Sequence, residues 1–157
     1  MYNTILLAYD GTQEGRLALR EGARMAQLCG ARRVILLAVV DPSVGLAMAV
    51  DPVAGYLPLH EDIDYQKILD VGVERLKLMG LSPEARLEAG IPAERIAAVA
   101  GEVAADLVVV GHHRQGVMAR WLHGSVTNSL TDALECSLLV ARQDIADEVL
   151  FGAEGLR

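Results

Sequence analysis

Two glycine-containing stretches of the chain carry residue types that bind anions in proteins. The longer stretch runs from Gly111 to Thr127 and holds glycines at positions 111, 116 and 124. Glycine lets backbone amides approach a phosphate closely, and a helix that opens at Gly124 and Ser125 would add unpaired amides and the positive end of its dipole. The stretch therefore predicts an anion site, although Gly111 and Gly116 could be ordinary turn residues and Ser125 an ordinary helix cap.

The shorter stretch is Asp10-Gly11-Thr12, which follows an apolar run near the start of the chain. The Asp10 carboxylate cannot hold a phosphate directly, because like charges repel. It could instead hold a divalent metal such as Mg²⁺ that bridges to the phosphates, or a ribose hydroxyl. It could equally cap the helix that follows.

Three histidines lie in the longer stretch, at positions 112, 113 and 123. Adjacent histidines in a loop seldom face the same way, and no carboxylate or cysteine joins these three, so the spacing does not indicate a zinc site. A backbone contact from His112 or His113 to a phosphate is the better interpretation. Trp121 falls in an apolar part of the stretch, which favours an anchor in the core or at an interface.

The elements that would position these residues alternate between strand and helix. Apolar runs predict strands at 5–9, 34–40, 85–89, 107–110 and 138–141, and helical spacing predicts helices at 13–29 and 65–79, from Pro92 and from near Ser125. Buried parallel strands joined by helices form an α/β sheet covered on both faces, and such sheets bind ligands at the carboxyl ends of their strands. The segment from Pro42 to His60 has no clean period and is either a functional lid or a variable insertion.

The length and composition predict one acidic domain. The chain has 157 residues, and its net charge of −7 argues against nonspecific nucleic-acid binding through a basic face. Only Lys67 and Lys77 are lysines, so an anion site must use arginine or backbone amides. Cys29 and Cys136 have no metal-binding spacing, and we expect them to fill helix faces in a reducing compartment. Because the sequence shows neither a signal peptide nor a membrane span, we expect a soluble, cytoplasmic protein.

The longer stretch resembles the nucleotide-binding signature of the universal stress protein family, which reads Gly, two residues, Gly, nine residues, Gly, then Ser or Thr. Gly111 matches the first position, and Gly124 and Ser125 match the last two at the same separation. Arg114 stands where the family has its middle glycine, and Gly116 lies two residues later. Arg114 either costs strain, if this position needs a positive φ, or turns its guanidinium into the crevice to pair with a phosphate.

The resemblance extends along most of the chain. Similar stretches cover the first, second and fourth strands, the glycine-proline turn and the closing strand: Ala8 to Thr12, Val34 to Asp41, Ala105 to Gly111, Gly90 to Pro92 and Glu135 to Val140. The resemblance implies a universal stress protein domain over residues 1–143 and a C-terminal tail over 144–157. The implied fold is a single doubly wound, Rossmann-like α/β sheet of five parallel strands in the order 3-2-1-4-5, with helices on both faces.

The family's ATP-binding members imply ATP or AMP as the ligand, with Mg²⁺ between the nucleotide and Asp10; ADP or a cyclic nucleotide could take its place. The adenine would lie at the ends of the first two strands, and the phosphates on the longer stretch. The implied contact residues are Ala8, Asp10, the backbone of Val39, Gly111, His112, Arg114, Gly116, Gly124, Ser125, Val126 and Thr127.

The implied function is a cytoplasmic, homodimeric adenine-nucleotide-binding module of the stress response. The dimer would form by antiparallel pairing of the last strand, Leu138 to Ala141, whose apolar edge needs covering. We expect at most slow hydrolysis and name no catalytic residue, because His112 or His113 is the only candidate general base near the phosphates.

Two other functions stay open. One is a nucleotide-hydrolysing or nucleotidyl-transferring enzyme, although no His-x-Gly-His, Ser-Gly-Gly-x-Asp-Ser or Walker A motif occurs. The other is a dimeric scaffold that binds no nucleotide and acts through protein contacts, for which the apolar segment from Pro42 to His60 is the candidate surface.

Overall fold

The computed structural model describes residues 1–41, 64–112 and 130–141. Along these residues the elements are β1 (Thr4–Ala8), α1 (Gln13–Cys29), β2 (Arg33–Val40), α3 (Tyr65–Leu78), β3 (Glu84–Ala89), α4 (Pro92–Glu102), β4 (Leu107–Gly111), α6 (Leu130–Ala133) and β5 (Ser137–Ala141). The predicted alternation of strand and helix is confirmed. The segment from Pro42 to His60, the helix start near Ser125 and the tail over 144–157 lie outside the described residues.

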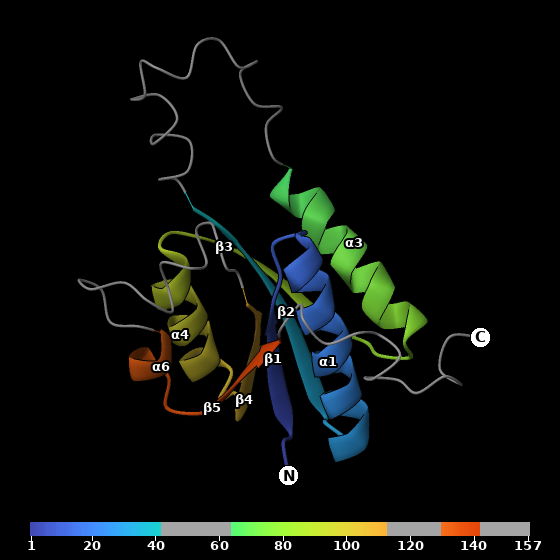
Figure 1. Cartoon of the computed structure of the whole chain (residues 1–157). Helices are drawn as coiled ribbons and strands as arrows, with labels where there is room; N and C mark the ends of the chain where they lie inside the picture. The colour runs from blue at the N-terminus through green and yellow to red at the C-terminus, as the bar shows by residue number, and fades with distance from the viewer. Residues whose placement is uncertain (42–63, 113–129, 142–157) are drawn as a thin grey trace, which may run out of the picture.

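The five strands form one parallel sheet in the order β3-β2-β1-β4-β5, as predicted (Figure 1). From β1 the chain builds outward through β2 to β3, and it then returns to the other side of β1 to add β4 and β5. The strand order therefore reverses between β1 and β4. In open sheets of this kind the crevice at such a reversal is the usual place for a ligand.

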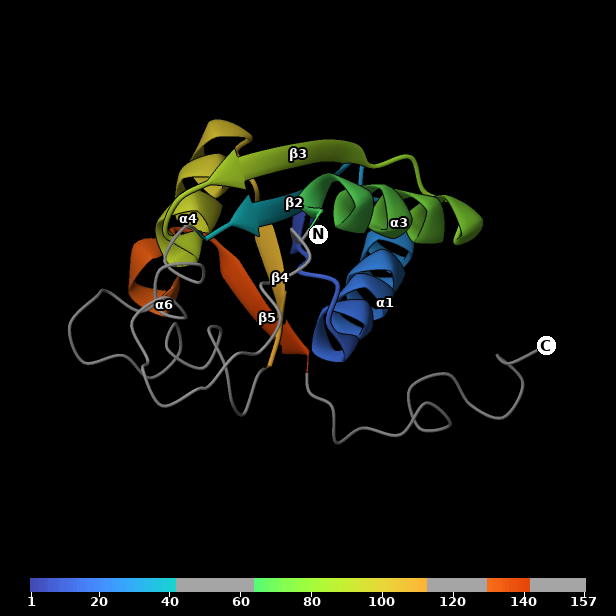
Figure 2. The ribbon, with the colours of Figure 1, turned by 90° about the horizontal axis from the view of Figure 1, so that it is seen from above.

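Helices cover both faces of the sheet, with α1 and α3 on one side and α4 and α6 on the other (Figure 2). Each central strand sends alternate residues into two separate cores, so that Leu7 lies in the core under α1 and α3 and Leu6 in the core under α4. Both side chains are 0% exposed. Burial on both faces explains why the central strands are continuous apolar runs rather than alternating ones.

The boundaries of α1 follow from its flanking residues. Thr12 has an extended backbone, and its hydroxyl accepts a hydrogen bond from the Gly15 amide at 3.1 Å, which is the geometry of an N-cap. At the other end Gly30 adopts a left-handed conformation with φ of 61°, which a glycine reaches without steric cost. The helix therefore spans the predicted residues.

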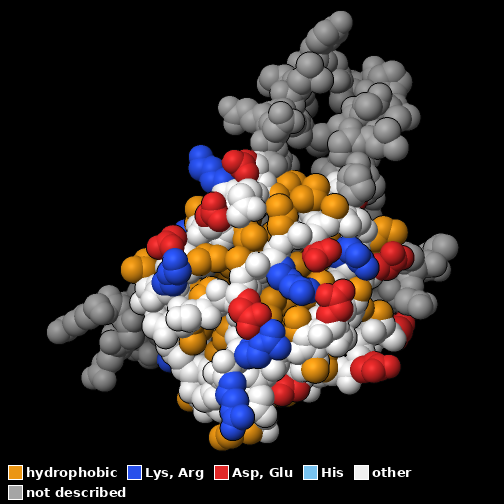
Figure 3. All heavy atoms as spheres, turned by 180° about the vertical axis from the view of Figure 1, so that it is seen from behind, with side chains coloured by type: hydrophobic (Ala, Val, Ile, Leu, Met, Phe, Trp, Pro, Cys, Tyr) orange, Lys and Arg blue, Asp and Glu red, His pale blue; other side chains and the backbone are white. Residues whose placement is uncertain are grey.

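The two edges of the sheet differ in polarity. The outer strand β3 carries ion pairs, in which Glu84 binds Arg33 at 2.9 Å and Arg86 binds Glu102 at 2.7 Å. Figure 3 shows basic and acidic side chains interspersed on the rear of the molecule, the side on which Figure 2 has β3. Charges of this kind discourage edge-to-edge pairing, whereas β5 at the opposite edge has the sequence Ser-Leu-Leu-Val-Ala and no charge.

One expectation about the cysteines needs correction. Cys29 ends α1, as predicted, but Cys136 lies directly before β5 and not on a helix face. It packs at the margin of the core under α4, because the chain must turn there to enter the edge strand. Neither cysteine forms a disulfide. Among the described residues, the helices are all too short or too polar to span a membrane.

Candidate functional site

Three of the residues expected to contact a ligand meet at the carboxyl edge of the sheet. In the register, Ala8 of β1 pairs with Leu37 of β2, and Leu7 pairs with Val109 of β4. Asp10, Val39 and Gly111 each follow these pairs by two or three residues, so they lie at the same end of neighbouring strands. This end is the reversal between β1 and β4, where the sequence predicted the site (Figure 1).

Asp10 organises the turn between β1 and α1. Its Oδ1 atom accepts hydrogen bonds from the Thr12 amide at 3.0 Å and from the Thr12 hydroxyl at 2.6 Å. The chain can make this tight turn because Gly11 has φ of 80°, a region that favours glycine. Asp10 therefore does not cap α1 itself: it holds Thr12, which is the cap.

The space around this carboxylate is narrow. A Cβ atom at Gly15, in the first turn of α1, would lie 2.6 Å from the Asp10 Oδ1 atom. A side chain at position 15 would therefore displace the carboxylate or the helix. The short distance shows that the start of α1 packs directly onto the end of β1.

Gly111 brings the end of β4 against the same helix. A Cβ atom at Gly111 would lie 2.7 Å from the backbone carbonyl atoms of Glu14 and 3.1 Å from the Gly15 amide nitrogen. The glycine is fully buried at this contact. A glycine is therefore needed at position 111 for a reason other than the predicted phosphate loop, namely the close approach of α1 and β4.

His112 follows directly and is half-buried. Its amide donates a hydrogen bond to the Ala141 carbonyl of β5 at 2.7 Å. The amide is therefore used within the sheet, and the backbone contact to a phosphate that we expected from His112 is not available in this arrangement. A ligand contact from His112 would have to come from its imidazole ring.

The other expected contact residues that the structure describes, Ala8 and Val39, would contact a ligand through their backbone atoms and not through their side chains. The Ala8 side chain is 4% exposed and lies in the core under α4, and Val39 packs against that same core. The expected positions Arg114, Gly116, Gly124, Ser125, Val126 and Thr127, together with His113 and Trp121, lie outside the described residues.

Two residues that the sequence analysis did not single out also border this edge. Asp41 follows β2 directly, so it could have been predicted from the tendency of ligands to bind at the carboxyl ends of parallel strands. Tyr65 begins α3, and no sequence signal marks it. The pKa of the Tyr65 hydroxyl is raised above its ordinary value by burial, then by the negative charge of Asp41 and that of Asp10. The tyrosine therefore lies within electrostatic range of both carboxylates.

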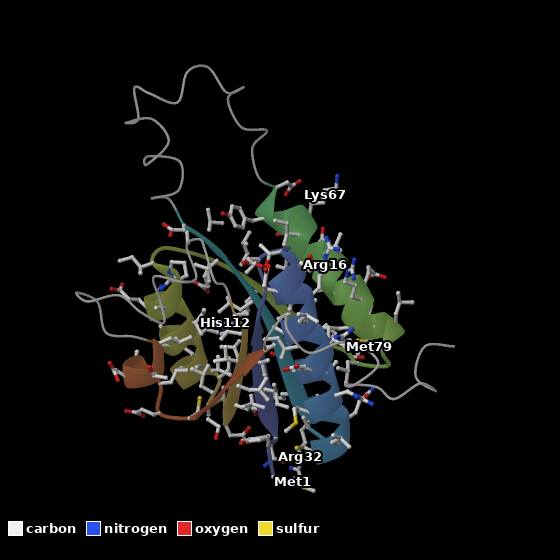
Figure 4. All side chains as sticks on the ribbon, in the orientation of Figure 1. Met1, Arg16, Arg32, Lys67, Met79 and His112 are labelled. Carbon is white, nitrogen blue, oxygen red and sulfur yellow. The ribbon has the colours of Figure 1, made fainter. Side chains whose placement is uncertain are left out.

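Two cationic side chains belong to the first turns of α1 and α3, which begin at this edge of the sheet. Figure 4 shows Lys67 in the first turn of α3 and Arg16 on α1, both on the side of the sheet that α1 and α3 cover. In the part of the chain that the structure describes, no group of three or more His, Cys, Asp or Glu side chains could hold a metal ion.

Known proteins are similar to this chain in both sequence and fold. A model of the universal stress protein family matches residues 1–142. The chain is 31% identical over 148 residues to a Thermus aquaticus protein described as "Universal stress protein in QAH/OAS sulfhydrylase 3'region", a match that covers 90% of this chain and 100% of that protein.

Two solved structures are similar in fold. A universal stress protein crystallised in complex with cAMP matches with a TM-score of 0.65 and 23% identity, over 90% of this chain and 97% of that one. A protein of the universal stress protein family from Burkholderia pseudomallei matches with a TM-score of 0.61 and 27% identity, over 88% of this chain and 95% of that one. The family model and the Thermus relative show that the chain belongs to the universal stress protein family.

Proposed function

We propose that this chain is a homodimeric adenine-nucleotide-binding module of the stress response that acts in the cytoplasm. The observation that carries the proposal is that Asp10 follows β1 and Gly111 ends β4, the two strands between which the order reverses, while Val39 lies near the same end of the neighbouring β2. This is the position at which open α/β sheets bind nucleotides. The similar structure with cAMP supports an adenine nucleotide as the ligand class.

The charges of the described residues suggest how the nucleotide lies. Asp41 makes the end of β2 acidic, which disfavours phosphates there and favours the uncharged nucleoside. Asp10, which follows β1, would meet the phosphates only through a cation. The phosphates would extend past Gly111 toward Arg114, Gly116 and the Gly124–Thr127 stretch. Arg114 would pair with a phosphate, which compensates for the scarcity of lysine in this chain.

Asp10 is the group that would meet Mg²⁺ carried by ATP. Its Oδ1 atom is already bonded to Thr12, so the carboxylate is held in one orientation before any ligand binds. A fixed carboxylate of this kind suits a cation whose other ligands are phosphate oxygens and water. We infer ATP or AMP as the ligand and at most slow hydrolysis.

The dimer would form through β5. The Ser137 amide donates to the Asp106 carbonyl at 3.3 Å, and the Ala141 carbonyl accepts from the His112 amide at 2.7 Å. Since alternate residues of a strand direct their backbone groups to the same side, Leu138 and Val140 direct theirs to the open edge. An uncharged edge with outward amides supports pairing with the β5 strand of a second copy. The module would comprise residues 1–143, and residues 144–157 would form a tail.

Ligand content and titration test this proposal. Mass spectrometry of the purified, denatured protein is expected to release an adenine nucleotide. Calorimetric titration with AMP, cAMP, and ATP with and without Mg²⁺ is expected to show binding by the wild type and its loss in Gly124→Val. A matched control is Gly101→Val, because a Cβ atom at Gly101 on α4 would meet nothing within 4 Å.

Each contrary outcome identifies an alternative. Absence of binding by the wild type would favour the scaffold that acts through protein contacts. Rapid phosphate release from ATP would favour an enzyme. Wild-type affinity in Gly124→Val would remove the phosphate stretch from the proposed site.

A further inference from the structure

The N-terminal half of α3 packs on the residues that follow β1, at the nucleoside end of the proposed site. A Cβ atom at Gly11 would lie 3.2 Å from Ile68, so Gly11 and Ile68 are already in close contact. One turn later, a Cβ atom at Gly72 would lie 2.8 Å from the ring of Tyr9. The helix therefore lies over β2 and against the residues that follow β1, with its N-terminus at the carboxyl edge (Figure 1).

Tyr65 extends this contact face past the end of the sheet. It lies three residues before Ile68 and seven before Gly72, and residues at this spacing share one face of a helix. The strand ends stop at Ala8 and Val40, so the first turn of α3 stands beside the polar residues that follow them. The Tyr65 ring is half-buried there.

The surroundings of Tyr65 define what it can offer a ligand. Asp41 and Asp10 supply negative charge, and ionised carboxylates only accept hydrogen bonds. The ordinary pKa of a tyrosine already lies well above neutral pH, and burial and these two charges raise the pKa of the Tyr65 hydroxyl further, so it is protonated and can donate. Tyr65 thus combines a flat apolar ring with a hydrogen-bond donor within electrostatic range of two carboxylates.

We propose that Tyr65 forms the α3-side wall of the nucleoside end of the site, where its ring packs against the base and its hydroxyl donates a hydrogen bond to an acceptor atom of the nucleoside. This inference rests on the proposed function. Tyr65 would be a determinant of base recognition that lies on α3, outside the two glycine-containing stretches. Since the Asp41 carboxylate disfavours phosphate at the end of β2, Tyr65 acts on the nucleoside and not on the phosphate chain.

Paired titrations with AMP and ATP test the role of Tyr65. Removal of the ring in Tyr65→Ala is expected to weaken the binding of both ligands about tenfold, as for the loss of one base–aromatic contact. Removal of the hydroxyl alone in Tyr65→Phe is expected to weaken the binding of both ligands about threefold, as for the loss of one neutral hydrogen bond. In each variant the fold-change in affinity is expected to be the same for AMP and ATP, because Tyr65 does not touch the phosphates.

The control is Tyr2→Phe, the same chemical change at a tyrosine that packs on the core at the start of β1. It is expected to leave both affinities unchanged, and thermal unfolding of all variants reports whether they are folded. Wild-type affinity in folded Tyr65→Ala, or a loss that grows from AMP to ATP, would overturn the role of Tyr65 alone. If the wild type binds neither nucleotide, the proposed function fails and the role of Tyr65 fails with it.

Discussion

The Cα atom of Gly111 at the end of β4 lies against the backbone of Glu14 in the first turn of α1. A Cβ atom at Gly111 would come within 2.7 Å of both the carbonyl carbon and the carbonyl oxygen of Glu14. A side chain can rotate away from such a contact, but a helix backbone cannot. The glycine therefore sets how closely the strand and the helix meet at the reversal of strand order, before any ligand is considered.

The first prediction concerns this contact. Gly111→Ala is expected to lower the free energy of unfolding by about 1–3 kcal/mol, because the added methyl group must push α1 away from β4. Urea unfolding followed by circular dichroism measures the change. Gly101→Ala is the control and is expected to stabilise by about 0.5–1 kcal/mol, since Gly101 lies on a helix with open space around its Cα. Equal stability of Gly111→Ala and the wild type would contradict the contact.

The second prediction concerns the start of α1. Thr12→Ala removes the hydroxyl that accepts from the Gly15 amide and donates to Asp10, so it is expected to cost about 1 kcal/mol of stability. Thr12→Ser keeps both hydrogen bonds and is expected to retain most of that stability. The same urea experiment measures both variants. A serine variant as unstable as the alanine variant would show that the methyl group of Thr12, and not its hydroxyl, is what matters.

Local pattern was enough to predict most of the fold. The runs from Ile5 and from Val34 are apolar throughout because they are buried on both faces, and this property identifies a parallel sheet without tertiary information. The bounds of α1 were equally readable, since Thr12 and Gly30 are local start and stop signals. The order of the strands came from the family resemblance and not from the pattern.

Less of the site than of the fold could be predicted from the sequence. Asp10 and Gly111 were expected at the carboxyl edge, but the engagement of the His112 amide by Ala141 depends on how β5 pairs with β4, which no local signal encodes. Tyr65 was missed for a similar reason. It reaches the edge because α3 packs closely, at Gly72 and against Gly11, on β2 and on the residues that follow β1. Contacts between elements far apart in the chain thus decide which side chains border the site.

The third prediction concerns the proposed dimer. Val140→Pro removes an amide that points to the open edge, so it is expected to leave the pairing of β4 with β5 intact but to convert the dimer into a monomer. Size-exclusion chromatography with light scattering measures the mass. Val140→Ala shortens the side chain yet keeps the amide, and it is expected to remain dimeric. A dimeric proline variant, or a monomeric wild type, would exclude backbone pairing through β5.

The last prediction concerns the pH dependence of stability and uses Glu21 on α1. Burial raises the pKa of the Glu21 carboxyl above its ordinary value of 4.5, and the charge of Arg20 opposes this effect only in part. The folded protein thus binds this proton more tightly than the unfolded chain does. Stability is therefore lost as the pH rises from the ordinary pKa through the raised one, and the loss persists at neutral pH.

Glu21→Gln cannot ionise, so it is expected to unfold at a higher temperature than the wild type at pH 7. The difference in melting temperature is expected to shrink as the pH falls through the carboxyl range, because the wild-type side chain is then protonated as well. Glu135→Gln makes the same charge change at an exposed carboxylate and controls for the effect of net charge. A Glu21→Gln variant that is less stable at pH 7 would mean that the charge of Arg20 outweighs the cost of burial and stabilises the ionised form of Glu21. An advantage that does not depend on pH would mean that ionisation of Glu21 is not its source.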